Sequence, residues 1–348
     1  MIERSEQGAD PAAAASAGPP GPLARPGARD PLVPSAWAPP PPGSRPGAGP
    51  PPGWAPPPPP YPPPSPPYGA PAGADVGSPD ADASLGRQLA AGGAPSSRSS
   101  AWMWMLFAGL GFLGGQVLAA LSVAVTAGFT GNLHSLTAIT KLAEPPTWYI
   151  VSTLIGLWAG FFGAAWMSSS VRGTHSMVRD LGLRFRWMDL LGIPIGVGGQ
   201  FLIALIYVPI AQHVTNFNQR FDAPSQRLTG ASHGTGYFVI AVCTVVGAPF
   251  FEELFFRGVL LRALARLFGT IGGWVGPALA IIVTGVLFGL AHAESLQLLG
   301  LAIFGIILSF VSYRTGRLGM NMIAHATFNL TALAAVVMPL ALGARVLF

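Results

Sequence analysis

Charged side chains are scarce in this sequence. Of its 348 residues, 9% are charged and 51% are hydrophobic, whereas a soluble domain usually carries about 25% charged residues. This scarcity excludes an ordinary soluble domain. Together with long apolar runs, it predicts a membrane protein.

Lysine and cysteine are almost absent. One Lys and eighteen Arg give a formal net charge of +5. The arginines are spread between apolar runs and form no basic patch, so we expect no nucleic acid among the partners. The single cysteine, Cys243, excludes an intramolecular disulfide, and its apolar surroundings predict an inert buried thiol.

Proline is concentrated at one end of the chain. Residues 1–98 hold 28 of the 36 prolines, including the run "PPPPPYPPPSPPY" at 56–68. A segment of this composition buries no core, so we predict a disordered Pro/Gly/Ala-rich cytoplasmic tail with polyproline-II character. Two interpretations stay open: a docking tail for a proline-recognising partner, or a low-complexity tail without one, which we favour.

Residues 99–348 differ abruptly from the tail and predict a transmembrane helical domain. Seven apolar segments approach the ~20 residues that span hydrocarbon. They are approximately 102–127, 148–170, 189–211, 236–256, 274–293, 296–312 and 319–341. The predicted fold is therefore an all-α polytopic membrane protein with a bundle of about 7–8 transmembrane helices. Four GxxxG spacings, at Gly111/Gly115, Gly156/Gly160, Gly192/Gly196 and Gly285/Gly289, predict close helix packing.

The arginine distribution predicts the orientation of these segments. If the tail is cytoplasmic, fifteen of the nineteen basic residues lie on the inner side, as the positive-inside rule requires. We therefore expect an integral, multi-pass cell membrane protein in contact with lipid, with its N-terminus cytoplasmic. Arg262 and Arg266 share one face of the segment 258–268, which predicts an amphipathic helix on the inner surface, continuing from the fourth span.

The stretch "PFFEELFFRG" places two carboxylates among aromatic rings. A charged residue near the bilayer centre costs about 2.5–3.5 kcal/mol, and such residues usually mark function. Glu253 and Arg257 are four residues apart, so they are expected to pair along one helix face. Glu252 points about 100° away from Glu253, which leaves it available to another partner.

Two further polar pairs have helical spacing on later segments. Phe288 and His292 share a face in "FGLAH", and His325 and Asn329 share a face in "HATFN". Three helices can therefore each present one polar edge to a common cavity.

Such a cavity has two chemical interpretations. A carboxylate beside a neutral imidazole can hold a water molecule and take its proton, while a second His and an Asn amide can donate to an oxyanion. This set makes a peptide hydrolase. Alternatively, Glu252, His292 and His325 are ligand types for a catalytic zinc with an open position, although the helical HExxH motif is absent. The sequence leaves open whether the cofactor is zinc or none.

The three motifs occur in a recognisable order. "EELFFR" fits EExxxR, "FGLAH" fits FxxxH and "HATFN" fits HxxxN, on successive apolar segments. The chain thereby resembles the CAAX protease and bacteriocin-processing (CPBP, or ABI) family of intramembrane proteases, whose eukaryotic members are type II CAAX prenyl endopeptidases. The resemblance covers about residues 148–341, which would be the protease core.

The resemblance implies an endopeptidase acting on a peptide or protein substrate, and it implies a role for each motif residue. Glu252 and His292 would activate the water, and His325 and Asn329 would form the oxyanion hole. The implied supporting residues are Glu253, Arg257 and Phe288. Metal dependence is not decided by the resemblance.

Two other classes of function fit the same residues. Glu and His inside membranes also mark proton paths, so a proton-coupled transporter is one alternative. The other is a non-catalytic membrane scaffold or immunity-type protein, in which the motifs only hold helices together.

Overall fold

The structure, a computed structural model, describes residues 98–230 and 234–342, and every regular element in these ranges is a helix. The elements are α2 (Arg98–Phe129), η2 (Leu133–Ser135), α3 (Leu136–Ile139), α4 (Thr147–Arg172), α5 (Met177–Asp180), η3 (Trp187–Leu191), α6 (Gly192–Ala211), α7 (Phe217–Thr229), α8 (Thr235–Val242), η4 (Cys243–Gly247), α9 (Ala248–Glu253), η5 (Leu254–Leu260), α10 (Leu261–Phe268), α11 (Val275–Ala291), α12 (Leu298–Thr315) and α13 (Gly319–Leu342). The all-α prediction is confirmed for this part of the chain. The predicted tail, except Arg98, lies outside the described residues.

Within the described part of the chain, five helices are long and apolar enough to cross a membrane. They are Ser100–Phe129, Thr147–Arg172, Trp187–Ala211, Thr235–Phe268 and Leu298–Thr315, and Val275–Ala291 is a shorter apolar helix. The prediction of a multi-pass helical membrane protein is confirmed at this level. The count of about 7–8 spans and the cytoplasmic N-terminus remain predictions.

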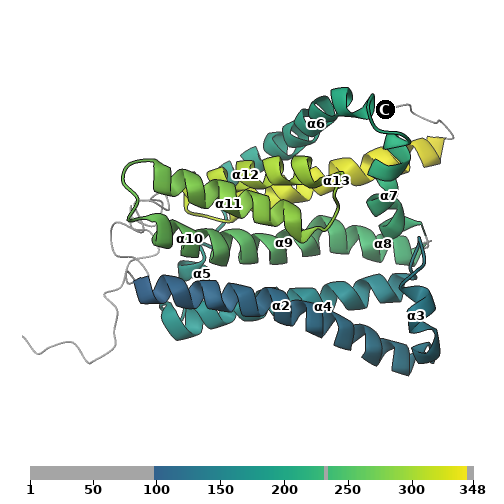
Figure 1. The fold of residues 1–348 in the computed structure, drawn as a ribbon, viewed down its shortest axis with the longest axis horizontal. Helices are drawn as coiled ribbons and strands as arrows, with labels where there is room; N and C mark the ends of the chain where they lie inside the picture. Colours follow the sequence, from purple (N-terminus) through teal and green to yellow (C-terminus); the bar gives the residue numbers. More distant parts are fainter. Residues whose placement is uncertain (1–97, 231–233, 343–348) are drawn as a thin grey trace, which may run out of the picture. The chain divides into compact units, whose positions relative to one another are not determined.

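One long helical rod, Thr235–Phe268, carries the two glutamates. Figure 1 shows its parts α8, α9 and α10 in line, with α2 and α4 on one side and α11 and α12 on the other. The rod is not α-helical throughout, because η4 and η5 are π-helical and flank α9 on both sides. Such π segments are rare and often occur at functional sites. Here they enclose the segment that ends at Glu252 and Glu253.

Glycines allow the helices to approach closely. Gly156 and Gly160 of α4 face the backbone of α2, where a Cβ would collide with Ala119, Gly111 and Gly115. The Gly192/Gly196 pair faces the α13 backbone in the same way, and the Gly285/Gly289 pair faces α12. The close packing predicted from the four GxxxG spacings is therefore confirmed.

The interpretation of residues 258–268 as an inner-surface helix is wrong in one respect. α10 does continue the fourth span, but it packs between α2 and α11 rather than on the surface. Arg262 is 3% exposed, and its Nη2 donates to Gly316 O at 2.9 Å. The guanidinium of Arg266 lies 4.4 Å from the ring centre of Trp104. A carbonyl just after the end of α12 and an aromatic face of α2 contact these cations, so the charged face of α10 is not exposed to solvent.

Candidate active site

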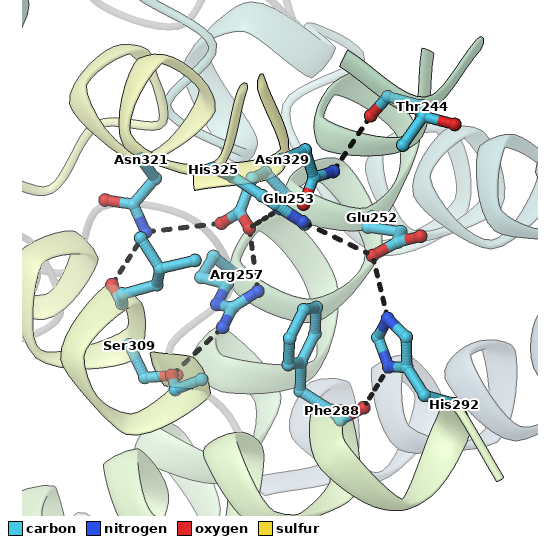
Figure 2. Close-up of polar contacts among 12 residues, drawn as sticks. Thr244, Glu252, Glu253, Arg257, Phe288, His292, Ser309, Asn321, His325 and Asn329 are labelled. Carbon is cyan, nitrogen blue, oxygen red and sulfur yellow. Dashed lines mark hydrogen bonds and ion pairs between the residues drawn. The ribbon is translucent and has the colours of Figure 1, made fainter. Parts of the chain in front are cut away.

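A fully buried carboxylate, Glu253, lies at the centre of the site. Its Oε1 accepts from Arg257 Nη1 at 2.8 Å and lies 3.0 Å from His325 Nδ1. Its Oε2 accepts from Asn321 Nδ2 at 3.3 Å. Figure 2 shows these three side chains around the carboxylate. An ionised group without water is stable only with such a set of partners.

The partners of Glu253 also bind the backbone of α12. Arg257 Nη2 donates to Gly305 O at 3.0 Å, and Asn321 Nδ2 donates to Leu308 O at 2.6 Å. The guanidinium of Arg257 additionally lies 4.5 Å from the ring centre of Phe288. One buried network therefore joins η5, α11, α12 and α13, and fixes the position of the histidine on α13.

The neighbouring carboxylate, Glu252, has a different environment. Its side chain is 15% exposed, and its buried Oε2 has no hydrogen-bond partner among the described residues. This oxygen lies 3.9 Å from His292 Nε2 and 3.9 Å from His325 Nε2 (Figure 2). Both distances exceed hydrogen-bond length. Two imidazoles from different helices thus face one carboxylate oxygen without bonding to it directly.

The tautomers of both histidines follow from their other ring nitrogen. His292 Nδ1 lies 2.8 Å from Phe288 O, and a carbonyl only accepts, so Nδ1 carries the hydrogen. His325 Nδ1 faces Glu253, a carboxylate that is already paired with Arg257, so it carries a hydrogen too. When neutral, both imidazoles therefore present an Nε2 lone pair to Glu252. Three hydrogen-bond acceptors converge on one place.

The structure brings all the residues predicted from sequence into this site. Glu252, Glu253 and Arg257 come from the central rod, Phe288 and His292 from the end of α11, and His325 and Asn329 from α13. Asn329 lies one turn beyond His325, and its Nδ2 donates to Thr244 O at 2.8 Å. The predicted pairing of Glu253 with Arg257 is confirmed. The catalytic roles of the others remain proposals.

Sequence reasoning missed two residues that support the site. Asn321 lies four residues before His325, so the helical spacing that linked His325 to Asn329 would also have found it. Tyr207 of α6 had no such signal, because it acts across the bundle. Its hydroxyl donates to Leu296 O at 2.6 Å and accepts from Gly300 N at 3.1 Å. It thereby ties α6 to the turn that follows His292.

Tyr207→Phe is expected to lower the free energy of unfolding by about 1–3 kcal/mol, because it leaves a backbone N–H and a backbone carbonyl without a partner. Tyr207 is 4% exposed, so water does not easily replace the hydroxyl. The matched control is Tyr237→Phe, since the Tyr237 hydroxyl is buried and has no hydrogen-bond partner within residues 98–230 and 234–342. The melting temperatures of Tyr207→Phe and Tyr237→Phe are measured by thermal unfolding in detergent. Equal melting temperatures for the two variants would contradict the prediction.

The residues that resemble zinc ligands do not have zinc geometry. With ligand bonds of about 2.0–2.1 Å, the donor atoms of a tetrahedral zinc site lie roughly 3.4 Å apart, whereas both Nε2–Oε2 distances here are 3.9 Å. Within residues 98–230 and 234–342, no group of three or more His, Cys, Asp or Glu is arranged to hold a metal ion.

Comparison with known proteins places the site within one domain. Residues 234–331 match the family described as type II CAAX prenyl endopeptidase Rce1-like, and this range contains the site from Thr244 to Asn329. The chain is also 28% identical over 136 residues to the uncharacterized protein YyaK of Bacillus subtilis (strain 168). That alignment covers 37% of this chain and 44% of YyaK, so the chain spans less than half the length of this relative. No solved structure matches the chain.

Proposed function

We propose, starting from the Rce1-like CAAX endopeptidase domain that residues 234–331 form, that this chain is an intramembrane endopeptidase with Glu252 as its general base. One observation carries the proposal. The buried Oε2 of Glu252, which has no hydrogen-bond partner in the described part of the chain, lies 3.9 Å from two imidazole nitrogens, each with its lone pair turned toward it when neutral.

Three converging acceptors suit a water molecule, because water offers two hydrogens. Glu252 Oε2 and His292 Nε2 are 3.9 Å apart. A water oxygen placed about 2.8 Å from each of them makes an angle of about 90° between the two contacts. This angle is close to the angle between the two O–H bonds of water. The water can thus donate one hydrogen to Glu252 and the other to His292, with its lone pairs left to face a substrate carbonyl.

Peptide hydrolysis then follows from the proton positions. Glu252 takes one proton as the water oxygen bonds to the carbonyl carbon, and returns it to the leaving nitrogen as the C–N bond breaks. His292 keeps the water oriented because Phe288 O holds its Nδ1–H. The products are a carboxylic acid and an amine, so protons and electrons balance without a metal.

The developing oxyanion needs donors, for which we propose Asn329 and His325. The amide of Asn329 has two N–H groups and uses one on Thr244 O. His325 presents a lone pair when it is neutral, so it donates from Nε2 only in the form that has taken a proton from solvent, and that proton stays on His325 throughout the turnover. The carboxylate of Glu253 lies 3.0 Å from Nδ1 and holds the ring in this orientation.

Cleavage is expected to survive treatment with a strong zinc chelator, because this mechanism needs no metal. The assay uses purified protein in nanodiscs and a library of quenched fluorescent peptides. Glu252→Gln is the negative reference, and the matched control is a zinc protease inactivated by the same chelator. Loss of cleavage after chelation, with recovery on adding zinc, would contradict the metal-free mechanism. Proton flux driven by a pH gradient, without peptide cleavage, would instead favour the transporter alternative.

A further inference from the structure

The carbonyl of Thr244 lacks both donors that a regular helix would offer it within the rod. In an α-helix it would accept from the N–H of Ala248, but that N–H donates to Cys243 O, since η4 is a π-helix. A π-helical bond would use the next nitrogen along the chain. That nitrogen belongs to Pro249, which has no N–H.

A side chain from another helix takes the place of the missing donor. Asn329 Nδ2 of α13 lies 2.8 Å from Thr244 O, and Figure 2 shows the amide turned toward this carbonyl. A backbone carbonyl away from water is nearly always satisfied in this way. The bond consumes one of the two N–H groups of the amide and so fixes its plane. The second N–H is thereby held in one direction.

We propose that Pro249 is a positioning residue for Asn329. By withholding an N–H, it keeps the Thr244 carbonyl available to anchor the amide. Pro249 precedes Glu252 by three residues, or about 4.5 Å of helix rise, so one stretch of backbone sets both the base and the anchor of Asn329. The kinetic part of this inference rests on the proposed function, in which Asn329 donates to the oxyanion.

A thermal double-mutant cycle tests the link between Pro249 and Asn329 independently of activity. Pro249→Ala supplies the missing N–H, so it is expected to satisfy Thr244 O when Asn329→Ala has removed the amide. We therefore compare the change in melting temperature that Pro249→Ala causes in two backgrounds. This change should be about 2–4 °C more positive in the Asn329→Ala background than in wild type. The general preference of helices for Ala over Pro is common to both backgrounds and cancels. Equal shifts in both backgrounds would overturn the proposal.

The matched control is Pro209→Ala, because Pro209 also lies inside a helix, α6, but is remote in sequence from the Thr244 anchor. Pro209→Ala should change the melting temperature by the same amount in wild type and in the Asn329→Ala background. Coupling of Asn329 to Pro209 as strong as to Pro249 would count against the specific role of Pro249.

A kinetic arm separates positioning from a merely structural role. Loss of one oxyanion donor typically costs 10²–10³-fold in kcat, so a misdirected donor in Pro249→Ala should cost at least about 10-fold in kcat with KM unchanged. The probe is the quenched peptide that wild type cleaves fastest. An unchanged kcat, or a rise in KM alone, would overturn the positioning role. Cleavage retained by Glu252→Gln would instead refute the proposed function and leave the thermal cycle valid.

Discussion

Glu252→Gln is expected to lower kcat/KM for peptide cleavage by about 10³-fold or more. General acid–base groups contribute typically 10²–10⁴-fold, and here the same oxygen would both take the proton from water and return it to the leaving nitrogen. Gln has nearly the same shape as Glu but cannot accept the proton. Cleavage of the best library peptide by wild type and variant, at equal protein concentration, measures the effect.

The same substitution should not destabilise the fold. In wild type, Glu252 Oε2 faces the lone pairs of two imidazoles, those of His292 and His325, at 3.9 Å. The Gln side chain can place N–H groups there, which donate to such lone pairs. We therefore expect an unchanged or higher melting temperature, as is common when an active-site group is removed. The control is Glu294→Gln, whose side chain is 34% exposed and lies 3.7 Å from Arg227. It should cleave like wild type. Glu252→Gln with wild-type activity would contradict the proposed base.

Arg257→Met is expected to lower the free energy of unfolding by about 3–5 kcal/mol, the typical cost of breaking a buried ion pair. Arg257 and Glu253 are both 0% exposed and lie 2.8 Å apart. Without the guanidinium, Glu253 keeps a negative charge away from water, and Gly305 O loses its bond to Arg257. Met retains much of the side-chain volume, so packing is nearly conserved. Denaturation in mixed micelles measures the loss.

The double variant Glu253→Gln/Arg257→Met separates charge from packing. A neutral amide still accepts from His325 Nδ1 and needs no cation, so most of the lost stability should return. This outcome would identify the unpaired charge as the cause. If the double variant is as unstable as Arg257→Met alone, the guanidinium stabilises mainly through Gly305 O and the Phe288 ring. A cost below about 1 kcal/mol for Arg257→Met would show that the pair is solvated, contrary to its burial.

Spacing along a helix predicted which residues share a face, and these predictions held within each helix. Glu253 does pair with Arg257, and His325 and Asn329 both reach the central rod. Spacing contains no information about which face of one helix meets which face of another. For that reason the bond between His325 and Glu253 was not predicted, and neither was the Tyr207 contact across the bundle.

Two features had weak or misleading sequence signals. Arg262 and Arg266 share a face that predicted an amphipathic helix on the inner surface, but their partners, Gly316 O and the Trp104 ring, are far away in the sequence. The π segments η4 and η5 lack a sequence signature, although Pro249 removes an N–H beside one of them. Main-chain partners of this kind become visible only when the helices are assembled.

If Glu252 is the base of the proposed endopeptidase, its position along the rod determines which form of substrate can react. Residue 252 lies near the midpoint of Thr235–Phe268. A peptide that crosses hydrocarbon as a helix has every carbonyl bonded to its own N–H groups. Its scissile carbonyl must therefore leave the helical ladder before water can attack it. Sequences that unwind easily beside Glu252, those with Gly or Pro near the cut, would meet the smallest conformational barrier, so backbone flexibility, as well as side-chain fit, would select the bond.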